Sequence, residues 1–339
     1  KMTIRFALLG AGRIGQVHAQ AISSNPQAQL VAVADFVEDA ANTLIEKFGG
    51  ELRTIDAIAA SNDIDAVLIC TPTNTHADLI EQFARAGKAI FCEKPIDLNV
   101  ARVVACLKVV EETGAKLMVG FNRRFDPHFI ALKEVITSGK IGTVEMINIV
   151  SRDPGAPPPE YIKVSGGIFK DMTIHDFDMA RFLLDEEIDT VMASASVLVD
   201  PAIGALGDFD SANVILTTAS GKQCAISNSR RATYGYDQRI EVHGSLGMVS
   251  VENQREASIE VATADGYTKP PLYDFFMTRY IAAYAAEIAA FIASLVNNTP
   301  ACPSGQDGLH ALLIAEATLK SVAEGRAVKI SEVAEVSVD

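Results

Sequence analysis

The chain has 339 residues, of which 49% are hydrophobic, and it carries a formal net charge of −14 at pH 7. This length exceeds the roughly 250–300 residues at which a single core stops growing, so the sequence predicts two domains. The strong negative charge argues against nucleic acid and anionic membranes as partners, because both would repel the protein.

The cysteines indicate a reducing compartment. There are five of them, an odd number without a C-x-x-C spacing, and most fall in apolar runs where a thiol acts as a small hydrophobe. The first residues enter a strand without an apolar leader. The apolar stretch 282–296 is interrupted by Glu287 and is too short to span a bilayer. We therefore expect a cytoplasmic protein.

The N-terminal segment has the pattern of a dinucleotide site. A short apolar strand, Ile4–Leu9, leads into a glycine-rich turn and a helix. In such a turn two glycines bring the backbone close to a pyrophosphate, and the third lets the helix pack on the strand. A second apolar run ends at Asp35, twenty residues after the third glycine, the spacing of a ribose-binding carboxylate. The expected cofactor contacts here are Gly10, Gly12, Arg13, Ile14, Gly15 and Asp35.

The segment up to residue 121 then alternates short apolar strands with helices. The strands are predicted at 65–70, 89–92 and 116–120, and the helices between them at 74–86 and 99–113. Nearly continuous apolar strands of this kind indicate a parallel sheet covered by helices on both faces, the doubly wound arrangement. We assign residues 1–121 to a dinucleotide-binding Rossmann domain.

Two loops follow predicted strands at the edge where such sheets bind ligands. The first contains Thr71, Asn74 and His76, and the second contains Glu93 and Lys94, and we expect all five to contact the cofactor. Asn74 is also expected to cap the following helix. Lys94 is followed by a stiffening Pro95, so its cation is aimed at the ligand and suits a developing alkoxide.

Residues 122–339 are predicted to form a second, α+β domain with an open, largely antiparallel sheet. Its short strands alternate in polarity and are separated by Gly and Asp turns. They are predicted at 144–150, 191–199, 212–218, 223–228, 239–243, 248–251 and 258–262, with helices near 171–184, 280–296 and 307–324. The Pro-rich stretch 153–159 is either a lid over a site or a rigid surface loop.

One helix of this domain carries candidate acid-base residues. The spacings of four and three place Asp171, His175 and Asp178 on one face, where a carboxylate can orient an imidazole that acts as a general base. The alternative is a helix N-terminus with acidic residues favoured by the helix dipole. A metal site is less favoured, because no second histidine or cysteine pair lies nearby at ligand spacing.

Taken together, five motifs resemble the glucose-fructose oxidoreductase / inositol dehydrogenase / rhizopine catabolism (Gfo/Idh/MocA) superfamily, over essentially the whole chain. They are Gly10-Ala-Gly-Arg-Ile-Gly15, Thr71-Pro72 with His76, Glu93-Lys94-Pro95, Gly120-Phe-Asn-Arg-Arg-Phe-Asp126, and Gly167-x-x-x-Asp171-x-x-x-His175-x-x-Asp178. Within the superfamily, three segments are most similar to the myo-inositol 2-dehydrogenases: 122–126 and 174–178, which are parts of these motifs, and 234–239.

The resemblance implies NAD-dependent oxidation of a secondary hydroxyl of a cyclic polyol, in particular myo-inositol to its 2-keto product. It assigns catalysis to Lys94, Asp171 and His175, with His175 as the base. It also implies substrate contacts by Asn122, Arg123, Asp153 and Tyr234, a cis bond before Pro95, and a homotetramer.

Other interpretations stay open at this point. Instead of binding substrate, Tyr234 would only line the end of a strand, and Arg123 would form an ion pair with Asp126. The chain would otherwise be a dehydrogenase for another inositol isomer or an aldose, or a non-catalytic NAD(P)-binding sensor on the same fold. The joint presence of lysine, histidine and aspartate favours the enzyme.

Overall fold

The computed structural model describes residues 2–334, which form two compact units. Unit 1 contains residues 2–126 and 282–312, and unit 2 contains residues 127–281 and 313–334. The sequence placed everything after residue 121 in a second domain. In the structure, residues 282–312 instead belong to the first unit, because the helix α11 (Ile281–Val296) packs into its core.

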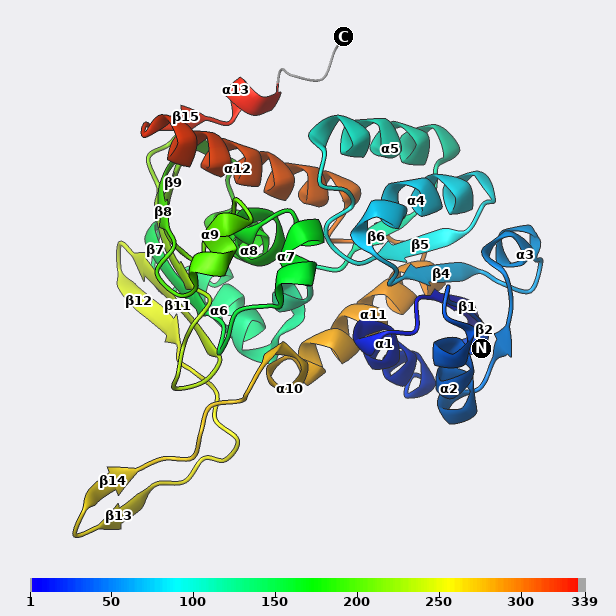
Figure 1. The fold of residues 1–339 in the computed structure, drawn as a ribbon, viewed down its shortest axis with the longest axis horizontal. Coiled ribbons are helices and arrows are strands. Elements are labelled where there is room, and N and C mark those ends of the chain that lie inside the picture. Colours follow the sequence, from blue (N-terminus) through cyan, green and yellow to red (C-terminus); the bar gives the residue numbers. More distant parts are fainter. Residues whose placement is uncertain (1, 335–339) are drawn as a thin grey trace. The chain divides into compact units, whose positions relative to one another are not determined.

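Unit 1 is built on a six-stranded parallel sheet (Figure 1). Its strands follow the order β3-β2-β1-β4-β5-β6, which is the strand order of a dinucleotide-binding Rossmann domain. Their bounds are β1 Ile4–Leu9, β2 Ala28–Ala34, β3 Glu51–Leu52, β4 Ala66–Ile69, β5 Ala89–Cys92 and β6 Leu117–Val119. The intervening helices are α1 Arg13–Ser23, α2 Glu38–Phe48, α3 Ile55–Ala60, α4 His76–Arg85 and α5 Val100–Thr113. The doubly wound prediction is confirmed.

Helix α11 completes the core of this unit. Its sequence is apolar almost all round, but its large apolar side chains Ile288, Phe291 and Ile292 are buried, and an alanine stripe at 285, 289 and 293 is exposed. The Phe291 ring lies 6.2 Å from the Phe6 ring and 5.9 Å from the Phe91 ring, both on central strands of the sheet. The buried face of α11 therefore packs into the core of the Rossmann sheet, which explains why this helix belongs to unit 1.

Unit 2 is built on a seven-stranded mixed sheet. Its order is β12-β11-β7-β10-β9-β8-β15, and its pairs are antiparallel except the parallel pair β7 and β10. The strands are β7 Val144–Arg152, β8 Ile188–Ser196, β9 Ser211–Thr218, β10 Gln223–Ser229, β11 Asp237–Gly244, β12 Gly247–Val251 and β15 Val328–Lys329. The largely antiparallel sheet is therefore confirmed, although β8 begins three residues before the predicted 191–199.

The sheet of unit 2 has one covered and one open face. Along β9 and β10 buried and exposed residues alternate, and Figure 1 shows α6 (Pro127–Thr137) and α8 (Ile174–Leu184) on the same side of the sheet. The other helical segments are α7 Pro159–Ser165, the π-helical η3 Phe169–Thr173, α9 Pro201–Ala205, α10 Phe276–Arg279, α12 Gly305–Glu324 (shared with unit 1) and α13 Ser331–Ala334.

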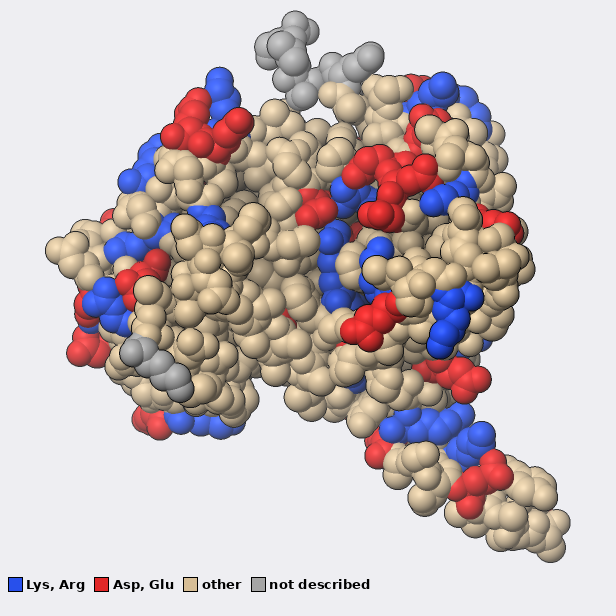
Figure 2. Space-filling view, turned by 180° about the vertical axis from the view of Figure 1, so that it is seen from behind, with Lys and Arg blue, Asp and Glu red and all other residues tan. Residues whose placement is uncertain are grey.

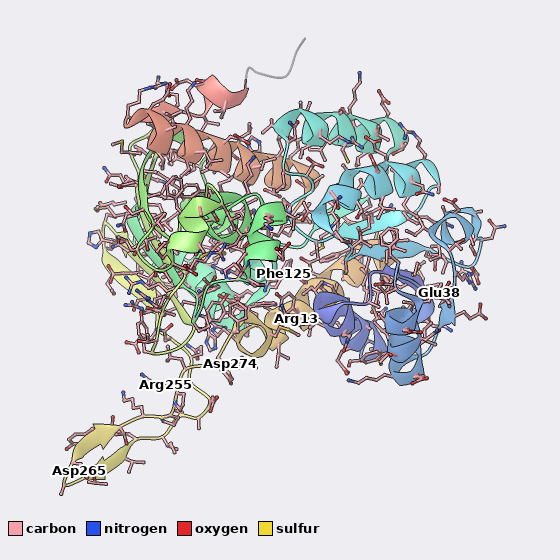
Figure 3. All side chains as sticks on the ribbon, viewed as in Figure 1. Arg13, Glu38, Phe125, Arg255, Asp265 and Asp274 are labelled. Carbon is pink, nitrogen blue, oxygen red and sulfur yellow. The ribbon has the colours of Figure 1, made fainter. Side chains whose placement is uncertain are left out.

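A two-stranded hairpin projects from unit 2 (Figure 1), with Asp265 at its turn (Figure 3). It consists of β13 (Val261–Thr263) and β14 (Gly266–Thr268), so the strand predicted at 258–262 is displaced toward the turn. Within residues 2–334, every helix is too short or too polar to cross a bilayer. All five cysteines are free thiols, and Cys92, Cys106 and Cys224 are buried as predicted.

Candidate active site

The glycine-rich turn of unit 1 has the backbone geometry that the sequence predicts. Gly10 has a φ of +97°, and a Cβ there would lie 2.4 Å from the Cys70 carbonyl oxygen. A Cβ on Gly15 would lie 2.1 Å from the Gly10 carbonyl oxygen, so these two positions exclude a side chain for internal reasons. A Cβ on Gly12 meets nothing within 4 Å. Arg13 follows at the start of α1 (Figure 3), and the open space at Gly12 fits the close approach of a pyrophosphate.

Asp35 lies at the end of β2, against this turn. Its Oδ2 accepts a hydrogen bond from the Ala11 amide at 2.6 Å, and its Oδ1 accepts one from the Val37 amide at 2.7 Å. The carboxylate thus fixes the turn, and each oxygen keeps lone-pair capacity for a ribose hydroxyl. Phe36 beside it is exposed and offers no cation to a 2′-phosphate.

We expect Asp35 to set the preference for NAD over NADP. A carboxylate accepts hydrogen bonds from ribose hydroxyls and repels a 2′-phosphate. Asp35→Asn removes the charge but keeps an oxygen for the Ala11 amide, so the NAD/NADP ratio of kcat/KM should fall by about tenfold, equivalent to ~1.4 kcal/mol. Steady-state kinetics with both cofactors measure this ratio. A wild-type enzyme that preferred NADP would contradict the role of this carboxylate.

His76 joins the two ligand-edge loops. The side chain is buried, with Nε2 2.7 Å from the Thr71 carbonyl oxygen and Nδ1 2.7 Å from the Pro95 carbonyl oxygen. Since both ring nitrogens are taken up by backbone oxygens, the structure gives His76 a role in bracing these loops. A direct contact with the cofactor stays a prediction.

Asn74 does not cap α4, contrary to the sequence prediction. It lies in the 3-10 turn η1 (Thr73–Thr75), and the N-cap position of α4 belongs to Thr75. The Thr75 hydroxyl donates to the Pro72 carbonyl oxygen and contacts the Thr71 hydroxyl at 2.6 Å, which closes the turn. Asn74 is exposed and Thr71 is half-buried, and both follow β4 at the edge of the sheet where a ligand is expected. Their contacts with the cofactor stay predictions.

The second loop begins directly after β5. The bond between Lys94 and Pro95 is cis, as the family resemblance implied. The Glu93 carboxylate is turned toward α1, where its Oε1 lies 2.5 Å from His18 Nε2. A cofactor contact by Glu93 and a substrate contact by Lys94 stay predictions.

Asn122 and Arg123 lie in the 3-10 turn η2 (Asn122–Phe125), and both are buried. The Asn122 Nδ2 atom has no hydrogen-bond partner within the described residues. A buried amide without a partner is costly, and a ligand oxygen is one partner that would satisfy it. The neighbouring Arg124 contacts Asp307 at 3.2 Å.

In unit 2 the predicted helix 171–184 has a change of winding at its start. Residues Phe169–Thr173 form the π-helical turn η3, and α8 begins at Ile174, so Asp171 and His175 lie on either side of the junction. Such π-turns are frequent at functional sites. Asp178 is buried on the next turn of α8.

The sequence missed the residue that brings two predicted carboxylates together. Arg230 donates to Asp153 Oδ2 at 3.0 Å and to Asp171 Oδ2 at 2.9 Å, and it is buried. Burial lowers the pKa of Arg230, but the two carboxylates outweigh that effect and raise it above its ordinary value. Tyr161 adds a hydrogen bond from its hydroxyl to Asp171 Oδ1 at 2.6 Å. Arg230 directly follows the end of β10, which is the signal that a search for basic residues at strand ends would use.

A second buried network lies next to this cluster along the chain. Asp176 is fully buried, and its carboxylate accepts hydrogen bonds from Ser151 at 2.9 Å and from Asn228 at 2.9 Å. Ser151 and Asn228 belong to the paired strands β7 and β10. The network therefore fixes the first turn of α8, which carries His175, against the sheet.

Tyr234 forms hydrogen bonds with Asp237 and Arg152, which are not members of the Asp153–Arg230–Asp171 cluster. Its hydroxyl donates to Asp237 and accepts from Arg152 at 3.1 Å, and its ring is half exposed. Partial burial and the bond to Asp237 raise the pKa of Tyr234. With Arg152, Arg231 and several serines it lines a polar pocket on the sheet. Its contact with a substrate stays a prediction.

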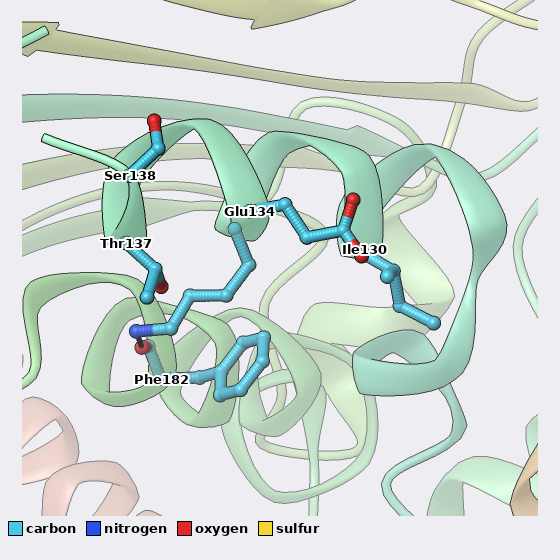
Figure 4. Close-up of a pocket in the computed structure, with 6 residues that line it drawn as sticks. Ile130, Glu134, Thr137, Ser138 and Phe182 are labelled. Carbon is cyan, nitrogen blue, oxygen red and sulfur yellow. Dashed lines mark hydrogen bonds between the residues drawn. The ribbon is translucent and has the colours of Figure 1, made fainter. Parts of the chain in front are cut away.

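The apolar pocket in Figure 4 contains no predicted site residue. It lies between α6 and α8 and is lined by Ile130, Lys133, Glu134, Thr137, Ser138 and Phe182. Lys133 spans it and donates to the Phe182 carbonyl oxygen at 2.6 Å. On the face drawn in Figure 2, basic and acidic side chains lie next to one another rather than in a broad basic patch.

Comparison with known proteins matches both units. Residues 4–121 match the model of an oxidoreductase family with an NAD-binding Rossmann fold, and residues 129–250 match the GFO/IDH/MocA C-terminal domain. The chain belongs to the GFO/IDH/MocA family of oxidoreductases. The family assignment made from the motifs is thereby confirmed, as are the Rossmann domain and NAD as its cofactor.

Several relatives of this GFO/IDH/MocA protein match over nearly their whole length. An inositol 2-dehydrogenase of Rhizobium meliloti is 68% identical, covering 97% of this chain and all of the relative. A myo-inositol 2-dehydrogenase of Thermotoga maritima is 45% identical, covering 97% of this chain and 99% of the relative. The crystal structure of a scyllo-inositol dehydrogenase from Lactobacillus casei, with NAD(H) and scyllo-inositol bound, superimposes with a TM-score of 0.90 at 28% identity, covering 97% and 99% of the two chains.

Proposed function

We propose that this oxidoreductase uses NAD to oxidise a secondary hydroxyl of a cyclic polyol, namely myo-inositol to its 2-keto product. The observation that carries the proposal is the buried cluster Asp153–Arg230–Asp171, built on the same unit as His175. Two carboxylates held by one guanidinium leave a net negative charge, and carboxylate oxygens accept hydrogen bonds, which suits a neutral ligand rich in hydroxyl donors. The names of the relatives support inositol as that ligand.

In this proposal one residue transfers the proton, and the others position the substrate. NAD, when bound, accepts the hydride. His175 takes the proton from the hydroxyl that is oxidised, and Lys94 holds the same oxygen while negative charge grows on it. Asp171 orients the substrate or the imidazole, and it is itself fixed by Arg230 and Tyr161. Asn122, Arg123, Asp153 and Tyr234 are proposed to bind the remaining hydroxyls.

One rival function remains. It is a dehydrogenase of the same family that acts on another inositol isomer, such as the scyllo-inositol of the Lactobacillus casei relative, or on an aldose. The non-catalytic sensor considered from the sequence does not agree with the match to an oxidoreductase family and to inositol 2-dehydrogenases over nearly the whole chain.

We also propose a cytoplasmic homo-oligomer, a tetramer by family resemblance. The five free thiols support a reducing compartment. The open face of the unit 2 sheet supports self-association, because it exposes four large apolar side chains: Met146, Met192, Ile215 and Met248.

The substrate assignment predicts steep specificity. A missing or inverted hydroxyl leaves a buried protein group unpaired, at about 1–3 kcal/mol each, so kcat/KM should fall about 5-fold to 150-fold per change. We expect myo-inositol to exceed glucose and linear polyols in kcat/KM with NAD. A panel of inositol isomers, aldoses and alditols, followed by NADH absorbance, measures this. An aldose that outperformed every inositol isomer would overturn the substrate and leave the dehydrogenase standing.

A further inference from the structure

Unit 1 contains a buried titratable cluster to which the proposed reaction assigns no chemical step. It consists of His18 on α1, Glu93 after β5 and Glu287 on α11, whose side-chain polar atoms lie within 4.8 Å of one another. The side chains of His18 and Glu287 are fully buried, and that of Glu93 is 14% exposed. Three elements distant in sequence thus converge on the residue that precedes Lys94.

The pair of His18 and Glu93 is hydrogen-bonded and closely packed, although the buried Nδ1 of His18 has no hydrogen-bond partner within the described residues. His18 Nε2 lies 2.5 Å from Glu93 Oε1, and the imidazole packs edge-on against Phe91 and Tyr284. A Cβ on Gly120 would lie 2.8 Å from Glu93 Oε2, so the carboxylate fills the space that a side chain there would take. Glu93 consequently has little freedom to move.

Glu287 closes the cluster from the side of α11. Its Oε1 lies 3.9 Å from His18 Nε2, and both of its oxygens lack a hydrogen-bond partner within the described residues. Burial, and then the charge of Glu93, raise the pKa of Glu287 well above its usual range. Burial beside Glu93 thus favours the neutral form of Glu287, which avoids two carboxylate charges in one buried place.

The distances favour a hydrogen-bonded cluster over a metal site. An ion shared by His18 and Glu93 would sit about 2.0–2.2 Å from each ligand atom, which requires the two atoms to be farther apart than 2.5 Å. We propose that His18 and Glu287 are positioning residues for Lys94. His18 holds the Glu93 carboxylate, and with it the backbone from which Lys94 extends, and Glu287 lies beside the imidazole at 3.9 Å and keeps it in place. This inference rests on the proposed role of Lys94 in the reaction.

The test combines substitutions in the cluster with Lys94→Ala. His18→Leu removes the bond to Glu93, His18→Gln keeps an N–H donor, and Ile22→Ala on the next turn of α1 is the control for lost packing alone. Each is measured with and without Lys94→Ala for kcat, NAD affinity and melting temperature. Glu287→Leu in the same two backgrounds is the second variant, in case His18→Leu fails to fold.

We expect His18→Leu to lower kcat about tenfold or more when Lys94 is present and to have no further effect on kcat when Lys94 is absent, because misplacement of a reacting group is what costs rate. His18→Gln should recover most of the loss, and Ile22→Ala should lower the melting temperature without lowering kcat. Glu287→Leu should follow His18→Leu, and Glu287→Gln, which is neutral like the buried acid, should stay close to wild type.

The outcomes separate this inference from the proposed function. Equal losses of kcat with and without Lys94, or a Glu287→Gln variant as poor as Glu287→Leu, would overturn the positioning role. If Lys94→Ala alone left kcat unchanged, the proposed function of Lys94 itself would fail.

Discussion

His175→Ala should lower kcat by about 10²–10⁴ and leave NAD affinity nearly unchanged, because the variant loses the base that takes the hydroxyl proton and keeps the Rossmann unit intact. The residue lies in unit 2, on the first turn of α8, whereas the glycine turn and Asp35 lie in unit 1. Steady-state kinetics and fluorescence titration with NAD measure the two quantities separately.

The control for this variant is His243→Ala, an exposed histidine on β11 of the same unit. It should keep wild-type kcat. The wild-type kcat/KM for oxidation should also rise with pH as the base of the free enzyme loses its proton, and His175→Ala should lose that dependence. Near-normal turnover without His175 would remove it from the mechanism.

Lys94→Ala should lose about 10²–10³ in kcat, the usual effect of removing one donor from an oxygen on which charge develops. The substrate KM should rise as well, since the same cation contacts the hydroxyl before the reaction. Initial rates at saturating NAD over a range of polyol concentrations separate these two effects.

The matched control is Lys108→Ala on α5 of unit 1, where the lysine is exposed and pairs only loosely with Glu112 at 4.0 Å. It should leave kcat and both KM values unchanged. A Lys94→Ala variant with normal kcat and weaker NAD binding would reassign Lys94 to the cofactor phosphates or ribose.

The sequence by itself determined the parts that depend on short stretches of chain. The Gly10–Gly15 turn, Asp35 and five of the six parallel strands follow from local backbone needs and from apolar runs, and the structure agrees with them. These five strands are recognisable because an inner strand of such a sheet must be buried on both faces. The edge strand β3 is exposed and has no apolar run, so the sequence pattern missed it. The cap expected at Asn74 failed because a 3-10 turn moved the start of α4 by one residue, an effect of hydrogen bonds that the spacing of residues does not encode.

Only the tertiary structure decided which distant residues meet. Arg230 joins Asp153 and Asp171 because β7 and β10 pair in parallel, and nothing in the local sequence specifies that register. The sequence shows only that Glu287 interrupts an apolar stretch, whereas in the structure α11 returns to unit 1 and buries it beside His18 and Glu93. A buried charged group is stable only with partners or as a neutral acid, and those conditions are set by three-dimensional packing, not by the order of residues.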